Sequence, residues 1–318
     1  MRAKWHAVWF TPQPASVLAL WRTALGVTAT VWLLSLSLDL GAFYGEGGVN
    51  PDPAYSVGRF GILRWWESDV AVYLVFFVGL AAALLLVAGR GVRVAAPVLA
   101  LALMSLQSDN SAVLNSGDSL LRIWCVLFAI FALLTPSRLS GAPLFGVAKP
   151  RGEVEYPLAP TWFLRLVQLQ LTVIYPASVV AKFDGEKWLD GTASLYALGL
   201  EQLERFPVPD FFRDSLFIGG VLTYSTLALE ITLPFLLWIP RTRRLAIVLG
   251  LALHIGFDYP LRLGFFAWSM AIGYVAFLTP AEAAAVAGWL RRLWSRVRDP
   301  LGAVRSNAAP RPRSRRYP

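Results

Sequence analysis

Lys182 ends an apolar run that carries other polar side chains at helical spacing. Gln168, Thr172 and Tyr175 share one face of the predicted helix, and Trp188 follows Lys182. An amine held in a dry site gives up its proton readily, so Lys182 could act as a base. Tyrosine, lysine and tryptophan also cluster at lipid headgroups as anchors, and the pattern leaves both roles open.

A second polar patch, with Asn115, Asp118 and Arg122, lies where another apolar run begins. Two further ionisable residues interrupt later apolar runs: Glu230 near the middle of one and His254 in the outward half of another. Because an unpaired carboxylate in lipid is costly, Glu230 is predicted to be protonated or paired with a facing group such as Arg122 or His254. Glu230 could have a purely structural role in such a pair or could take up and release a proton, and the sequence leaves both roles open.

The sequence lacks the residues of several common catalytic sites. Cys125 is the only cysteine, which excludes a disulfide, a cysteine-based zinc site and a C-x-x-C redox pair. The two histidines, His6 and His254, are far apart in the chain and do not make a metal site. No Ser–His–Asp set, phosphate-binding loop or metal-ligand spacing is present. We therefore expect no metal cofactor.

The composition indicates a membrane protein. Of the 318 residues, 56% are hydrophobic and only 15% are charged, whereas soluble domains have about 25% charged residues. The net charge of +9 would suit a nucleic-acid binder, but the apolar content would not. We therefore expect a lipid bilayer around the protein and no nucleic-acid partner.

Hydropathy predicts an all-α, polytopic membrane helix bundle with about eight transmembrane helices. A helix needs about 20 apolar residues to cross a bilayer, and runs of this kind are present while alternating barrel strands are not. The predicted spans are Ala15–Phe43, Asp69–Val87, Val92–Gln107, Ser119–Leu134, Trp162–Val180, Leu216–Trp238, Leu245–Phe257 and Leu263–Leu278. The first is longer than one crossing needs, and the third, fourth, seventh and eighth are short.

Lysine and arginine residues gather on one side of these spans, whereas most acidic residues lie on the other. By the positive-inside rule the basic side is cytoplasmic, and an even number of spans places both termini there. We expect a multi-pass protein of a bacterial-type plasma membrane. Arg22 and Arg165 lie near cytoplasmic ends of spans, so we expect both to snorkel towards the interface.

The chain is predicted to divide into a transmembrane domain, residues 1–280, and a basic extension. Residues 281–297 have the pattern of an interfacial amphipathic helix, in which Trp289 and Trp294 accompany four arginines. Residues 298–318 are rich in proline, arginine and serine and are predicted to be a disordered basic tail. The extension could fix the topology or contact a lipid or a partner.

The order of these motifs resembles the HTTM (horizontally transferred transmembrane) domain family over about residues 10–280. The segment Tyr175–Gly191, with Lys182 and Trp188, is similar to the family signature of a tyrosine-ending helix, a lysine and Trp-x-x-Gly. Asn115–Arg122 resembles the polar loop and helix start of bacterial members. His254 is similar to the histidine of a late family helix. The family includes the vitamin K-dependent gamma-glutamyl carboxylases.

In those carboxylases, the lysine that matches Lys182 removes a proton from vitamin K hydroquinone. The resemblance therefore implies a reduced quinone, menaquinol or vitamin K hydroquinone, as cofactor, at a site on the extracytoplasmic side. Lys182 would be the catalytic base, with His254 and Asp118 as helpers. The pocket would be formed by Tyr175, Gln168, Thr172, Asn115, Arg122, Trp188 and Glu230.

Two functions are compatible with this resemblance. One is a vitamin K-dependent carboxylase-like or other quinol-dependent enzyme that modifies a secreted peptide or protein. The other is a non-catalytic membrane maturation or immunity factor for such a substrate. The enzyme would require Lys182, whereas the second function would tolerate changes there and depend on the outer loops Glu46–Trp66 and Lys187–Asp214.

Overall fold

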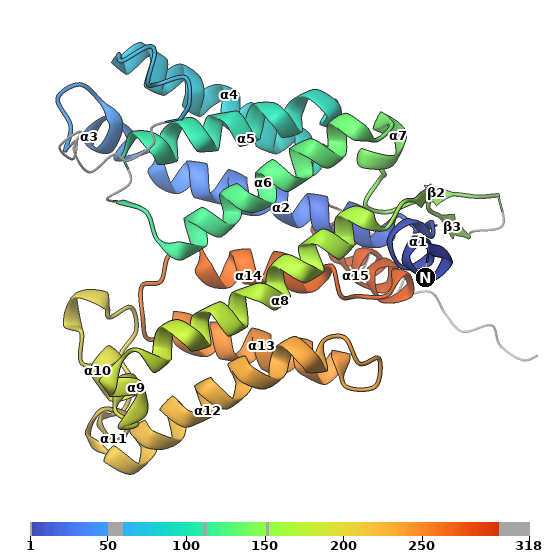
Figure 1. The fold of residues 1–318 in the computed structure, drawn as a ribbon. Helices are drawn as coiled ribbons and strands as arrows, with labels where there is room; N and C mark the ends of the chain where they lie inside the picture. Colours follow the sequence, from blue (N-terminus) through green and yellow to red (C-terminus); the bar gives the residue numbers. More distant parts are fainter. Residues whose placement is uncertain (1, 50–59, 111–112, 151–152, 299–318) are drawn as a thin grey trace, which may run out of the picture.

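The long helices of the computed structural model, which describes residues 2–49, 60–110, 113–150 and 153–298, form one bundle (Figure 1). In chain order they are α2 (Ser16–Leu36), α4 (Asp69–Ala88), α5 (Val92–Asp109), α6 (Ser116–Leu134), α8 (Trp162–Phe183), α12 (Leu216–Leu236), α13 (Arg243–Asp258) and α14 (Phe266–Val275). Helices α2 and α4–α6 make one half of the bundle, and α8, α12 and α13 make the other. Helix α14 packs against both halves.

Smaller elements and one further helix cover the two ends of the bundle (Figure 1). At one end lie α1 (Arg2–Phe10), α7 (Ser137–Ser140), α15 (Pro280–Arg298) and two antiparallel strand pairs, β1 (Gln13–Pro14) with β4 (Leu158–Ala159) and β2 (Val147–Ala148) with β3 (Val154–Glu155). At the other end lie α3 (Leu40–Tyr44), α9 (Glu186–Leu189), α10 (Ala193–Leu198), η3 (Glu201–Leu203) and α11 (Asp210–Asp214).

Among the described residues, six helices are long and apolar enough to cross a membrane: α2, α4, α5, α6, α8 and α12. The prediction of an all-α, multi-pass membrane protein is confirmed at this level. Helices α13 and α14 have 16 and 10 residues, so the count of eight spans and the side of the termini remain predictions. Residues 299–318, predicted to be disordered, lie outside the described residues.

The first predicted span, Ala15–Phe43, is wrong in its extent. Helix α2 ends at Leu36, and the short helix α3 begins at Leu40. The excess length therefore belongs to a separate element at the end of the bundle opposite α1 (Figure 1). The third and fourth spans, by contrast, are longer than predicted, with 18 and 19 residues in α5 and α6.

Residues that satisfy the free backbone groups of a helix mark several helix ends. Ser68 precedes α4 and accepts a hydrogen bond from the N–H of Ala71, and Gly89 ends α4 in the left-handed region with φ 68°. Asn115 and Asp118 form a capping box at the start of α6, each side chain accepting from the other's backbone N–H.

A buried aromatic cluster joins α2, α6 and α8. The ring of Trp21 lies 4.8 Å from that of Phe163, 5.6 Å from that of Phe128 and 6.1 Å from that of Trp124, measured between centroids. Aromatic pairs at such separations add to the stability gained from burial alone. This cluster fixes α8, the helix that carries Lys182, to the first half of the bundle.

Arg22 is buried in the bundle, so the prediction that it snorkels to the interface is wrong. Its guanidinium donates hydrogen bonds to the backbone oxygens of Leu86, in the last turn of α4, and Ala142. Carbonyls at the end of a helix lack partners within the helix and favour a cation. Gly89 leaves room for this contact, since a Cβ there would lie 3.0 Å from the guanidinium.

Replacing Arg22 by methionine should lower the free energy of unfolding by about 3 kcal/mol, because buried carbonyl oxygens lose a charged donor. Unfolding of the purified protein in detergent measures this change. Arg138→Met, at an exposed arginine of α7, is the matched control and should have little effect. Equal stability of the two variants would contradict this role of Arg22.

Candidate functional site

Lys182 and Glu230 form an ion pair between α8 and α12. Nζ of Lys182 donates to both carboxylate oxygens of Glu230, at 2.6 and 2.8 Å, and to Oγ of Ser178 at 2.5 Å. The ammonium group thus has an acceptor for each of its three protons. Only 16% of the Lys182 side chain and 9% of the Glu230 side chain is exposed. The partner of Glu230 is therefore Lys182, not Arg122 or His254 as the sequence suggested.

The position of Lys182 on α8 explains this geometry. Ser178 precedes it by one helical turn and so lies on the same face of the helix. Lys182 also lies in the last turn of α8, where the helix dipole favours a positive charge. The ring of Trp188 lies 4.9 Å from Nζ and provides a further favourable contact for the ammonium.

The ion pair lines a cavity of about 240 Å³, which we call the polar cavity. Ser178, Trp188 and His254 also line it, together with apolar residues of α13 and α14. Because His254 is buried and close to the Lys182–Glu230 pair, three ionisable side chains share one small space. Such a convergence of ionisable groups in a cavity is typical of a functional site.

His254 links the polar cavity to a pair of buried tyrosines. Oη of Tyr175 lies 3.0 Å from Nε2 of His254 and is also hydrogen-bonded to Oη of Tyr274. Tyr175 and Tyr274 are each 1% exposed. A short hydrogen-bond chain therefore runs from the cavity, through α8, to α14, and it can hold or relay a proton.

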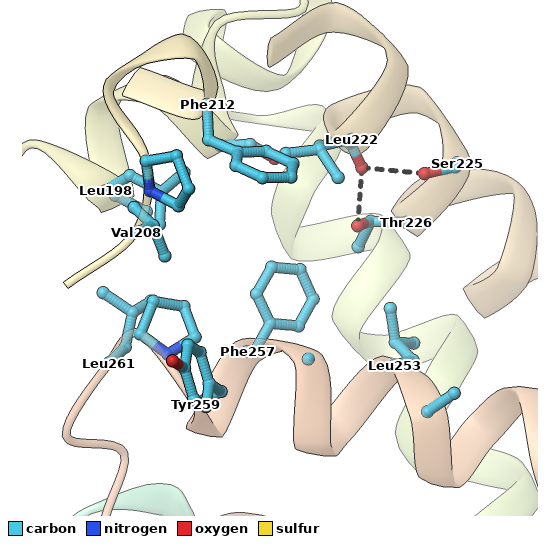
Figure 2. A pocket seen from close by; sticks show the side chains of 16 residues that line it. Leu198, Val208, Phe212, Leu222, Ser225, Thr226, Leu253, Phe257, Tyr259 and Leu261 are labelled. Carbon is cyan, nitrogen blue, oxygen red and sulfur yellow. Dashed lines mark hydrogen bonds between the residues drawn. The ribbon is translucent and has the colours of Figure 1, made fainter. Parts of the chain in front are cut away.

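A larger, mostly apolar cavity of about 440 Å³ adjoins the polar one (Figure 2). We call it the apolar cavity. The two cavities share the lining residues Ser194, Ala197, Thr226, Leu253 and Phe257. Figure 2 shows Phe212 of α11 on one side of the apolar cavity and Phe257 of α13 on the other. Together the two cavities form one space, with charged side chains at one end and apolar walls at the other.

Residues 184–215, which we call the outer segment, contain four short helical elements, of which α10 and α11 line the apolar cavity. Arg205 ties this segment to the end of α13 through its ion pair with Asp258, at 2.6 Å, and its backbone N–H bond to Pro260. Arg213 pairs with Glu204 within the segment. Specific contacts therefore hold the outer segment to α13, a helix that also lines the apolar cavity.

The structure brings together part of the predicted site. Lys182, Glu230, His254 and Trp188 line the polar cavity, and Tyr175 contacts His254. All of them come from α8, α12, α13 and the outer segment, in the second half of the bundle.

The predicted residues of the second polar patch, Asn115, Asp118 and Arg122, line neither cavity. The carboxylate of Asp118 accepts hydrogen bonds from Nε1 of Trp32 at 2.8 Å and from the N–H of Asn115 at 2.9 Å. The contact with Asn115 caps the start of α6, and the contact with Trp32 joins α6 to α2. The Asp118 side chain therefore has a structural role. Arg122 lies half-buried on α6 and does not line either cavity.

Gln168 and Thr172 lie along α8, towards the end opposite Lys182. Nε2 of Gln168 donates to the backbone oxygen of Ala276, and Oγ1 of Thr172 accepts from Nε1 of Trp238. Each contact joins α8 to a neighbouring segment. Both residues therefore have partners outside the cavities.

Sequence reasoning missed Ser178 and Tyr274. Ser178 could have been found from its spacing of four residues before Lys182. Tyr274 is far from Tyr175 in the chain, so its contact depends on the packing of α14 against α8.

The fold and the site together define a multi-pass helical membrane protein with an ionisable cluster in a cavity of its second half-bundle. A family model described as the HTTM domain matches residues 10–281. The chain therefore belongs to the HTTM domain family, as its motifs indicated. Comparisons with curated proteins and with solved structures find no match.

Lys182→Met alone should lower the free energy of unfolding by about 3–5 kcal/mol, because it leaves a buried carboxylate unpaired. The double variant Lys182→Met/Glu230→Leu should recover most of this loss, because no lone charge remains. Unfolding in detergent, analysed as a double-mutant cycle, measures the coupling.

The exposed pair of Lys187 and Asp190, 3.6 Å apart, provides the control. Lys187→Met should cost at most about 1 kcal/mol. If the double variant at Lys182 and Glu230 were less stable than either single variant, the pair would not be the stabilising unit described.

Proposed function

We propose that this HTTM-family protein is a quinol-dependent enzyme of a bacterial-type plasma membrane that modifies a secreted peptide or protein, in the manner of the vitamin K-dependent carboxylases. The observation that carries the proposal is the buried Lys182–Glu230 pair in a polar cavity that opens into an apolar one. Proton removal needs a positioned ionisable group, and a lipophilic cofactor needs apolar walls.

The two cavities suit the two parts of a prenylated quinol. The hydroxyl-bearing ring matches the polar cavity, where Lys182, Glu230 and His254 offer hydrogen-bond partners. The isoprenoid tail matches the apolar cavity, with Phe212 and Phe257 among its walls. Bound there, the quinol would supply an acidic hydroxyl and reducing electrons.

The geometry of the ion pair constrains how Lys182 acts as a base. The three protons of its ammonium group are directed to Ser178 and Glu230, so Nζ has no free lone pair in this arrangement. Nζ can accept a proton only if it passes one of its own to Glu230. We therefore assign the base function to the pair, with Glu230 as final acceptor and the Lys182 ammonium left beside the oxyanion that forms.

A non-catalytic maturation or immunity factor remains the second candidate. It is favoured by exposed aromatic side chains on the outer segment, where Tyr196, Phe206 and Phe211 are each about half exposed or more. Such residues suit contacts with a peptide. This function does not require the ion pair.

The double variant Lys182→Met/Glu230→Leu separates the two candidates. If the protein is an enzyme, this variant should fold but lose at least about 100-fold in the oxidation of quinol by molecular oxygen, because the proton acceptor is gone. Quinol oxidation is measured in proteoliposomes to which the quinols of the natural membrane are added. Turnover equal to that of the unchanged protein would exclude the enzyme proposed here.

Gly256→Leu tests the apolar cavity. Gly256 lines this cavity, and a Cβ there would meet no atom within 4 Å, so leucine should fill the cavity without a clash. We expect quinone that co-purifies in mild detergent, detected by mass spectrometry, to fall from stoichiometric to a small fraction.

Gly220→Leu is the matched control for this experiment. Gly220 is also helical and also has free space around it, but it lies outside the apolar cavity. Equal quinone content in the two variants, or none in the unchanged protein, would argue against quinol binding there.

A further inference from the structure

Helix α15 is held firmly at its first turns. Ala283 and Ala287 are buried, and the helix packs against α2. Thr279 and Glu282 form a capping box, with hydrogen bonds of 2.7 and 3.2 Å between each side chain and the other's backbone N–H. Nε of Arg244 donates to the same carboxylate.

The charge of Glu282 is already matched by these partners. Burial acts to raise the pKa of Glu282, but the hydrogen bonds from Thr279 and Arg244 prevail and lower it to about 2. The carboxylate is therefore ionised at neutral pH and engaged at the start of the helix. It is also the only acidic residue of α15.

The last turns of α15 extend beyond the packed part of the helix. Every residue from 291 to 298 is exposed. Trp289, Leu293 and Val297 follow one another at intervals of four residues, which places them along one side of the helix, with Trp294 beside Leu293. Among them, Trp294 is 62% exposed and Val297 76% exposed. An apolar strip of this kind is left uncovered by the bundle.

Basic residues occupy much of the rest of this surface. Arg291, Arg292, Arg296 and Arg298 lie in the same exposed turns, and no acidic residue accompanies them. Tryptophan and leucine on one side of a helix with arginine on the other is the pattern of a helix that lies in the headgroup layer. The charge complements anionic headgroups, not zwitterionic ones.

Helix α1 provides an independent marker of the headgroup level at this end of the bundle (Figure 1). Its Trp5 is 63% exposed and lies 5.1 Å from the ring of Trp9. Arg165 and Thr161 at the start of α8 donate to backbone oxygens of α1 and hold it in place. Exposed tryptophans on two terminal helices at one end of a bundle are typical of an interfacial belt.

We propose that the last turns of α15 bind anionic phospholipid headgroups, with Trp289, Leu293 and Val297 turned towards the acyl chains and the arginines paired with phosphate groups. This surface is independent of the polar cavity and of the function proposed above. Its occupant is the anionic surface of the surrounding bilayer.

A single-cysteine label tests the placement, because Cys125 is buried and leaves no competing surface thiol among the described residues. We would attach a polarity-sensitive fluorophore to Leu293→Cys in the full chain and reconstitute it in nanodiscs. One set contains phosphatidylcholine alone and the other a mixture with phosphatidylglycerol. The fluorophore should report an apolar environment in the mixture and a more aqueous one in phosphatidylcholine.

Ser295→Cys is the matched label, since Ser295 lies in the same turn away from the apolar strip. Its emission should remain aqueous in both lipids. In a second measurement, native mass spectrometry compares retained lipids for Arg292→Gln/Arg296→Gln. The ratio of phosphatidylglycerol to phosphatidylcholine should fall by roughly fivefold for each arginine removed.

The proposal is overturned if the Leu293→Cys label gives the same emission in both lipids, or if the double arginine variant retains the lipid ratio of the unchanged protein. It is also overturned if both labels are equally shielded, as burial of the whole helix against a protein partner would produce.

Discussion

The ion pair of Lys182 with Glu230 is the interaction on which the second half of the bundle depends. Neither charge is tolerable alone among apolar helices, and each satisfies the other across α8 and α12. Their contact fixes the separation of these two helices at the level of the polar cavity. His254 and Trp188 then complete the walls, and the outer segment covers the adjoining apolar space.

Much of the fold could be predicted from sequence because lipid imposes a simple requirement on helix length. The prediction Asp69–Val87 is almost the same as α4, Asp69–Ala88, since the apolar run and its capping residues coincide. The end of α2 was harder to predict. No proline or glycine interrupts the run between α2 and α3, and the position of α3 depends on distant groups, such as the Asn110 amide that donates to the backbone oxygen of Phe43.

The sequence predicted which residues form the site better than it predicted which of them contact each other. Lys182, Glu230 and His254 stood out because charge or a titratable ring interrupts apolar runs. The partner of Glu230 could not be read from the sequence, because it depends on how α12 packs against α8. For Asp118, by contrast, the sequence held a local signal that the resemblance to the carboxylases obscured, since that resemblance implied a role as a catalytic helper. Its spacing of three residues from Asn115 is a local capping signal, and the structure uses it in that way.

The closeness of the two charges also determines how the site responds to the electrical field across the membrane. Nζ of Lys182 and the nearer Glu230 oxygen are 2.6 Å apart, so a proton that moves between them travels less than about a tenth of a hydrocarbon core roughly 30 Å thick. A full crossing of one charge is worth about 2.3 kcal/mol per 100 mV, so the free energy of this step would change by less than about 0.2 kcal/mol per 100 mV. The energetics of the proposed proton transfer within the pair would therefore depend very little on the membrane potential.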